Sequence, residues 1–114
     1  MVADTIYERG DVIFGVDPFK PDGTGRPWVI VSNHEGRPFH GEQYIALTLT
    51  TRTWLDGLVA VPESAWSRGG TPDDSRIVPW GVQSLGSADI ERWQGRLGES
   101  VVDDAVEKLV QEVQ

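Results

Sequence analysis

Turn signals recur at close spacing along this 114-residue chain, and they limit how long any one element can be. The runs between them are rich in β-branched and aromatic residues, which fit the pleated surface of a strand. The sequence therefore predicts strands at about 11–17, 27–33, 43–51, 57–62, 75–80 and 90–97. Short strands joined by close turns favour a barrel or a sandwich over alternating β–α units.

The C-terminal segment has a different period. Its apolar residues follow the i, i+3, i+4, i+7 spacing of one helix face. They are Val102, Ala105, Val106, Leu109, Val110 and Val113. Ser100 followed by Asp103 resembles a capping box, which favours a helix start at that point. A helix of about 13 residues is marginal alone, so we expect its apolar stripe to pack against the sheet or against another subunit.

Length and composition indicate one small domain. At roughly 100–200 residues per domain, residues 1–114 are predicted to form a single unit. The chain has no cysteine, so it forms no disulfide. No run approaches the ~18 consecutive apolar residues of a membrane span, and the N-terminus shows no basic segment before an apolar core. We expect a cytoplasmic protein that does not contact a membrane.

The net charge of −8 is distributed unevenly. Residues 26–76 hold five arginines against six acidic residues, a charge of −1, so an anionic partner meets least repulsion there. The acidic, lysine-poor composition has two interpretations: ordinary solubility charge, or adaptation to very high salt. If the second is correct, the melting temperature will rise between dilute and multimolar salt, and a flat or falling curve would contradict it.

The available side chains exclude several kinds of chemistry. Without cysteine there is no thiol nucleophile and no thiolate metal site. His34 and His40 lie near Glu35 and Glu42 in one loop, but their spacing matches no zinc motif, so no metal site is predicted. The chain also lacks a dinucleotide fingerprint, a P-loop and a G-x-S-x-G serine elbow. Accordingly, no cofactor is expected.

Arginine and threonine remain as the candidate functional groups. Arg26 opens the second predicted strand, while Thr48, Thr50 and Thr51, with Arg52, end the third. If neighbouring strand ends bring Arg26 and Thr50 together, a guanidinium and a hydroxyl could grip a phosphate. The alternative is that Arg26 makes an ordinary surface salt bridge and the threonines fill strand positions.

The order and spacing of five motifs resemble the MazF/PemK family of toxins over residues 8–113. The motifs are residues 10–14 (GDVIF), 25–33 (GRPWVIVSN), 46–51 (ALTLTT), 75–80 (SRIVPW) and 95–97 (GRL). The resemblance implies a mainly β fold, an SH3-like small barrel of the MazF/PemK/CcdB type with a C-terminal helix. It also implies a homodimer and an antitoxin partner.

For activity, the resemblance implies a metal-independent endoribonuclease toxin that cuts single-stranded RNA. In that family the ribose 2′-hydroxyl attacks the adjacent phosphorus, giving a 2′,3′-cyclic phosphate and a 5′-hydroxyl. Carried over to this sequence, the matched catalytic positions are Arg26 and Thr50. The arginine stays protonated at any working pH and would stabilise charge on the phosphorane. The threonine would bind a non-bridging phosphate oxygen and fix the geometry of attack.

The proton acceptor is less well defined. His34 directly follows the second predicted strand, where the family often has an acidic residue. It is our candidate general base because histidine titrates near neutral pH, and a solvated loop histidine is the alternative. Asp17 and Glu42 are further candidates for this role.

Because a charge of −8 weakens an electrostatic hold on RNA, we expect binding to rely on base stacking. The candidate substrate-binding residues lie in loops or at strand ends: Phe19, Thr48, Thr51, Arg52, Trp54 and His40. Among the other tryptophans, Trp28 is predicted to lie in the core, and Trp80 and Trp93 in the core or at a subunit interface.

A second hypothesis keeps the barrel but not the activity. Gyrase-poisoning relatives share the fold, so the fold alone does not decide the function. On this hypothesis the chain is a non-catalytic PemK-like barrel that binds nucleic acid or a protein partner. The presence of Arg26 and Thr50 favours the enzyme, whereas the acidic charge and the histidine at position 34 favour the binding protein.

Overall fold

The structure is a computed structural model of the chain, and it describes residues 6–18, 20, 23–33, 39, 41–52 and 55–114. Its strands and helix follow one another in the order β1 (Asp11–Val16), β2 (Gly25–Ile30), β3 (Gln43–Thr50), β4 (Val59–Val61), β5 (Trp66–Gly69), β6 (Ser75–Gly86), β7 (Ile90–Leu97) and α1 (Glu99–Val113). Short 3-10 turns at Glu63–Ala65 and Ser87–Asp89 precede β5 and β7. The predicted class, mainly β with a C-terminal helix, is confirmed.

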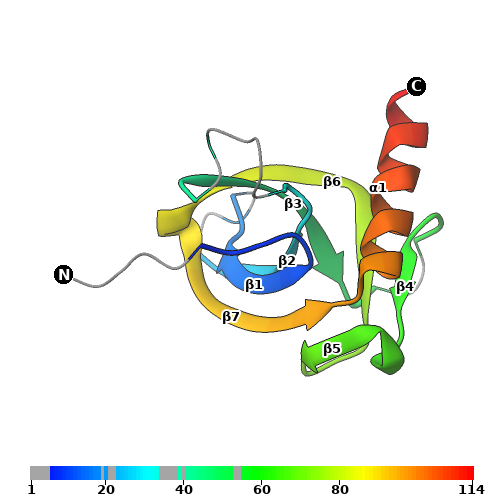
Figure 1. The fold of residues 1–114 in the computed structure, drawn as a ribbon, viewed down its shortest axis with the longest axis horizontal. Helices are drawn as coiled ribbons and strands as arrows, with labels where there is room; N and C mark the ends of the chain where they lie inside the picture. The colour runs from blue at the N-terminus through cyan, green and yellow to red at the C-terminus, as the bar shows by residue number, and fades with distance from the viewer. Residues whose placement is uncertain (1–5, 19, 21–22, 34–38, 40, 53–54) are drawn as a thin grey trace.

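The seven strands form one antiparallel sheet in the order β4-β6-β3-β2-β1-β7-β5. The sheet curls into a partly open barrel, with β6 along one side and β7 along the other (Figure 1). The three-stranded meander β1–β2–β3 lies at its centre. No helix in the described part of the chain is long and apolar enough to cross a membrane.

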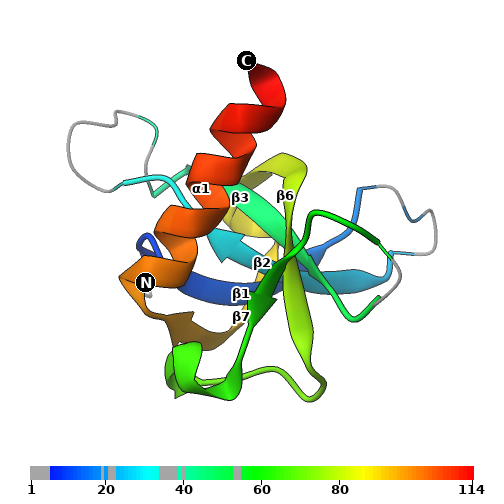
Figure 2. The ribbon, with the colours of Figure 1, turned by 90° about the vertical axis from the view of Figure 1, so that its right-hand side faces the viewer.

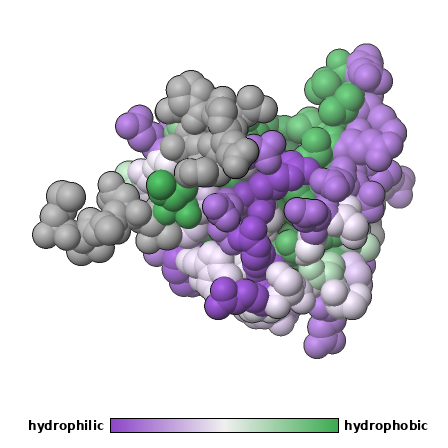
Figure 3. All heavy atoms as spheres, in the orientation of Figure 1, coloured by the Kyte–Doolittle hydropathy of each residue, from purple (hydrophilic) through white to green (hydrophobic). Residues whose placement is uncertain are grey.

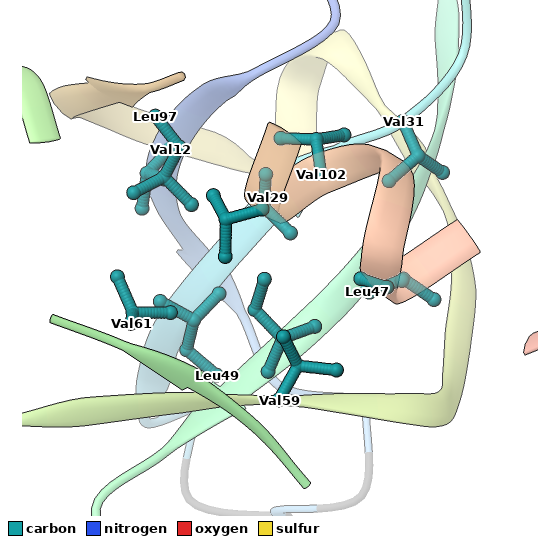
Figure 4. Packing of buried hydrophobic residues seen from close by; sticks show 12 residues of the cluster. Val12, Val29, Val31, Leu47, Leu49, Val59, Val61, Leu97 and Val102 are labelled. Carbon is teal, nitrogen blue, oxygen red and sulfur yellow. The ribbon is translucent and has the colours of Figure 1, made fainter. Parts of the chain in front are cut away.

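The main hydrophobic core lies between the concave sheet and α1 (Figure 4). Val12, Val29 and Leu47 supply it from β1, β2 and β3, and each is fully buried. Val102 and Ala105 of α1 pack onto the same cluster. Fully burying an aliphatic side chain contributes about 1.5–3 kcal/mol, so this contact stabilises a helix that is too short to be stable alone.

Only the first half of the predicted apolar stripe is buried. Val106 and Leu109 are partly covered by the core, whereas Val110 is 44% exposed and Val113 is 75% exposed. The end of α1 projects beyond the barrel (Figure 2), and Figure 3 shows hydrophobic residues gathered there.

A second core lies on the other face of the same strands. Its buried members are Ile13, Trp28, Ile30, Tyr44, Ala46 and Leu85. Tyr7 packs edge-on against Tyr44 at a ring-centroid distance of 5.8 Å, and burial, then Tyr44 and Asp11, raises the pKa of its hydroxyl above the ordinary value. The core position predicted for Trp28 is confirmed. Trp80 and Trp93 are 47% and 40% exposed, so a core position is wrong for both. Their location at a subunit interface stays a prediction.

The strand β6 is twice as long as expected, because Pro79 and Gly81 bend it instead of ending it. Leu49 pairs with Ile77 and Leu47 with Val82, so a step of two residues along β3 corresponds to a step of five residues along β6. Any Cβ at position 81 would lie 2.6 Å from the Thr48 methyl group. The absence of a side chain at Gly81 therefore allows β6 to cross closely over β3.

Two other details differ from the sequence-based expectation. The strand β5 was not predicted, because its sequence, WSRG, contains no β-branched residue; its pairing with β7 forms it. The prediction of a capping box at Ser100 was also wrong, since α1 begins at Glu99 after Gly98 and has no side-chain cap. Asp103 instead accepts a hydrogen bond from Arg9 at 2.6 Å.

Candidate active site

A cavity of about 260 Å³ opens where β2 begins and β3 ends. Because these neighbouring strands are antiparallel, the start of one lies beside the end of the other. Arg26 is the second residue of β2 and Thr50 is the last residue of β3, and both line the cavity. Its other lining residues are Lys20, Pro27, Leu49, Thr51, Arg52 and Ser75. Arg26 and Thr50, the pair singled out from the sequence, therefore lie on one cavity.

The Arg26 guanidinium is held from two sides. Nη2 donates to the Leu49 carbonyl at 3.0 Å, which ties it to the strand that carries Thr50. Nη1 donates to Oδ2 of Asp17 at 3.4 Å. The Arg26 side chain is 30% exposed, while its Nε atom is buried and has no hydrogen-bond partner among the described residues. The side chain thus keeps donor capacity while its plane is fixed.

Thr50 contributes a hydroxyl in the wall of the same cavity. The residue is 8% exposed, and its Oγ1 accepts a hydrogen bond from the Arg52 amide at 3.2 Å. A hydroxyl that accepts one bond can still donate its own proton. Within the described part of the chain, Thr50 donates that proton to no group. The residue can therefore donate to an anion in the cavity.

Positive charge gathers at this cavity although the whole chain is acidic. Lys20, Arg26 and Arg52 line it together, whereas the net charge is −8. Asp17, the carboxylate beside Arg26, is only 2% exposed. The arrangement of three cations, a hydroxyl and little room is suited to one phosphate group.

Two larger cavities have a different character. One of about 600 Å³ lies between β1, β7 and the start of α1 and mixes Glu8 and Glu99 with two arginines. Those arginines are engaged, Arg9 with Asp103 at 2.6 Å and Arg96 with Asp11 at 2.8 Å. Another cavity, of about 480 Å³, is lined by acidic residues beside β5. Neither is as well suited to an anion as the Arg26 cavity.

The structure places the remaining predicted residues as follows. Thr51 and Arg52 line the Arg26 cavity. Thr48 does not; it lies under the bend of β6, 8% exposed, and its hydroxyl donates to the Leu49 carbonyl at 3.3 Å. Phe19, His34, His40 and Trp54 lie outside the described residues. Their roles stay predictions.

Two of the proposed proton acceptors have other surroundings. Asp17 is buried against Arg26, and Glu42 precedes β3 at the end opposite Thr50. Among the described residues, no three histidine or acidic side chains come together as metal ligands.

The sequence analysis missed Lys20 and Ser75 as lining residues and missed the ion pair between Asp17 and Arg26. A signal for Lys20 was present in the sequence. It is one of only two lysines in the chain, and it lies in the loop that follows the first predicted strand. The ion pair had no signal, because it depends on how the loop between β1 and β2 closes.

The curled sheet, the covering helix and the small cavity define a small β-barrel with a C-terminal helix. No protein-family model and no curated protein sequence matches the chain. Solved structures do match: a MazF from Deinococcus radiodurans is 14% identical, with a TM-score of 0.74 over 96% of this chain and 98% of that one. The chain therefore has the MazF fold.

Two complexes show the same similarity. An endoribonuclease in complex with its cognate antitoxin from a Mycobacterial species is 21% identical, with a TM-score of 0.71 over 96% of this chain and 94% of that one. A MazE–MazF structure from Deinococcus radiodurans is 17% identical, with a TM-score of 0.70 over 96% and 97% of the two chains. At these identities the similarity establishes the fold, and the resemblance noted from the motifs is confirmed at that level.

Proposed function

We propose that this chain is a metal-independent endoribonuclease toxin that cleaves single-stranded RNA and is controlled by an antitoxin. The observation that carries the proposal is the position of Arg26 and Thr50 on one small cationic cavity. Similarity to solved MazF endoribonucleases, two of them in complex with an antitoxin, supports it.

The proposed reaction is the one that the family resemblance implies. The ribose 2′-oxygen attacks phosphorus, the bond from phosphorus to O5′ breaks, and a 2′,3′-cyclic phosphate forms. The 2′-hydroxyl loses its proton to a base, for which His34 remains our candidate, and the departing O5′ takes up a proton. Negative charge grows on the non-bridging oxygens, where Arg26 and the Thr50 hydroxyl would stabilise it. Lys20 and Arg52 would hold the flanking phosphates.

Binding of the rest of the strand is proposed to use base stacking by Phe19, Trp54 and His40, together with polar contacts from Thr51 and Arg52, whereas Thr48 is covered by β6 and takes no part. The apolar surface supports a homodimer that is also bound by the antitoxin. Trp80 and Val82 of β6 are 47% and 41% exposed, and Val110 and Val113 of α1 are exposed as well. Such exposed groups are typical of surfaces that a partner covers.

A cleavage assay on purified protein tests the proposal. Mixed-sequence RNA incubated with the protein in excess EDTA is expected to be cut, and the products are expected to carry 5′-hydroxyl and 2′,3′-cyclic phosphate ends. Ligation or kinase labelling of the products identifies those ends. Intact RNA that nevertheless binds the protein would favour the non-catalytic barrel, and cleavage that EDTA abolishes would contradict metal independence.

A further inference from the structure

The carboxylate that faces Arg26 is unusual in its burial. Asp17 directly follows β1 and is 2% exposed, in contrast to Asp103, the partner of Arg9, whose side chain is 64% exposed. Burying a carboxylate costs several kcal/mol unless a cation or hydrogen-bond donors compensate. The fold therefore requires a compensating group at this position, and the Arg26 guanidinium at 3.4 Å is one that the structure provides.

The backbone fixes Asp17 relative to β2. Its amide donates to the Thr24 carbonyl at 3.1 Å, and its carbonyl accepts a hydrogen bond from the Lys20 amide at 3.1 Å. In the sheet, Gly15 pairs with Arg26, so the chain leaving β1 stays beside the residue that enters β2. The backbone of Asp17 is thus held beside the start of β2, and its buried side chain lies against Arg26.

Fixing two nitrogens of a guanidinium fixes its plane, because the group is planar and rigid. Asp17 holds Nη1 and the Leu49 carbonyl holds Nη2. With both held, the direction of the third nitrogen, Nε, is also determined. That atom is buried and has no partner among the described residues, so its orientation depends on the bonds that hold the two Nη atoms.

We propose that Asp17 is a positioning residue that orients the Arg26 guanidinium toward a phosphate bound in the cavity. The inference rests on the proposed function for its effect on RNA cleavage. It assigns Asp17 a role through Arg26, in place of the proton-acceptor role considered from the sequence.

The charge of Asp17 has an opposite effect on binding. It offsets one of the three cations at the cavity, so its removal strengthens the attraction for an RNA phosphate while it loosens Arg26. Replacing Asp17 should therefore lower kcat and also lower KM. Simple loss of folded protein would reduce the active fraction without strengthening binding, so the two effects are distinguishable.

The test compares Asp17→Asn with Asp103→Asn, which makes the same change at the exposed Arg9 pair on α1. For Asp17→Asn we expect kcat on a single-stranded RNA oligonucleotide to fall about tenfold to a hundredfold, together with a lower KM at low salt. For Asp103→Asn we expect wild-type kinetics. Equal kcat in the wild type and Asp17→Asn would overturn the inference. If Asp17→Asn does not fold, Asp17→Ser takes its place.

A second measurement does not need cleavage. The Arg26 Nε–H signal in a nitrogen–proton NMR spectrum is assigned by its absence from Arg26→Lys, and inorganic phosphate is then added. We expect the wild-type signal to be sharp and to shift with phosphate, and the Asp17→Asn signal to broaden. An unchanged signal in Asp17→Asn refutes the positioning role. If the wild type cuts no RNA, the proposed function fails, and this spectrum still decides on Asp17.

Discussion

Arg26→Lys protein is expected to lose RNA cleavage by roughly 10²–10³-fold, the typical cost of removing one donor to a developing oxyanion, while it remains folded. Lysine keeps a positive charge beside the buried Asp17, so the pair is not left uncompensated. It cannot reproduce the planar fork that reaches the Leu49 carbonyl and a phosphate together. Initial rates on a single-stranded RNA oligonucleotide, with circular dichroism as the folding check, measure the effect.

Arg9→Lys is the matched control for this prediction. Arg9 has the same pattern of bonds as Arg26, one to a backbone carbonyl, that of Val31 at 2.8 Å, and one to a carboxylate, that of Asp103. It lies away from the Arg26 cavity, so its replacement should leave cleavage unchanged. Thr50→Val keeps a β-branched side chain in the strand and removes only the hydroxyl, and we expect it to be defective like Arg26→Lys. Full activity in both site variants would remove them from the mechanism.

Trp28→Ala is expected to lower the free energy of unfolding by about 3–5 kcal/mol, a large part of the roughly 5–15 kcal/mol typical of a domain. Trp28 is 2% exposed and is the largest member of the second core. Its loss leaves a cavity between β1, β2 and β3, which the rigid sheet cannot close. Urea unfolding followed by circular dichroism gives the change as a lower midpoint.

Trp28→Phe separates packing from hydrogen bonding at the same position. The indole Nε1 of Trp28 is buried and has no partner among the described residues. Phenylalanine removes that N–H and keeps most of the ring, so we expect a markedly smaller loss than in Trp28→Ala. If the two variants were equally unstable, the size of the side chain would not be what stabilises this core.

The parts of the fold that follow from local pattern were predictable from the sequence. The β-branched runs predicted β1, β2 and β3 to within three residues at each end, and the apolar stripe predicted α1 and two of its buried residues, Val102 and Ala105. The strand β5 was not predictable, because WSRG contains no β-branched residue and pairs only with β7. The length of β6 was missed because a proline and a glycine inside a strand look like its end, whereas here they bend it over Thr48.

The two central residues of the candidate site were predictable from the sequence, but the contacts that hold them in place were not. Arg26 and Thr50 stood out through a resemblance of motifs, and antiparallel neighbours bring such strand ends together. The ion pair with Asp17 and the lining role of Lys20 depend on the path of the chain between β1 and β2, which periodicity does not encode. The bend of β6 at Gly81 similarly covers Thr48, so this residue does not line the cavity that Thr50 lines.

The two cores also share their strands residue by residue. Val12 enters one core and Ile13 the other, and Ala46 and Leu47 divide in the same way. Because both cores depend on the backbone of the same strands, disruption of one core also disrupts the other. Neither core can therefore unfold while the other stays folded. Heat or denaturant should dismantle it in a single concerted step. A protease that cleaves only unfolded segments would then cut these central strands only after global unfolding of the chain.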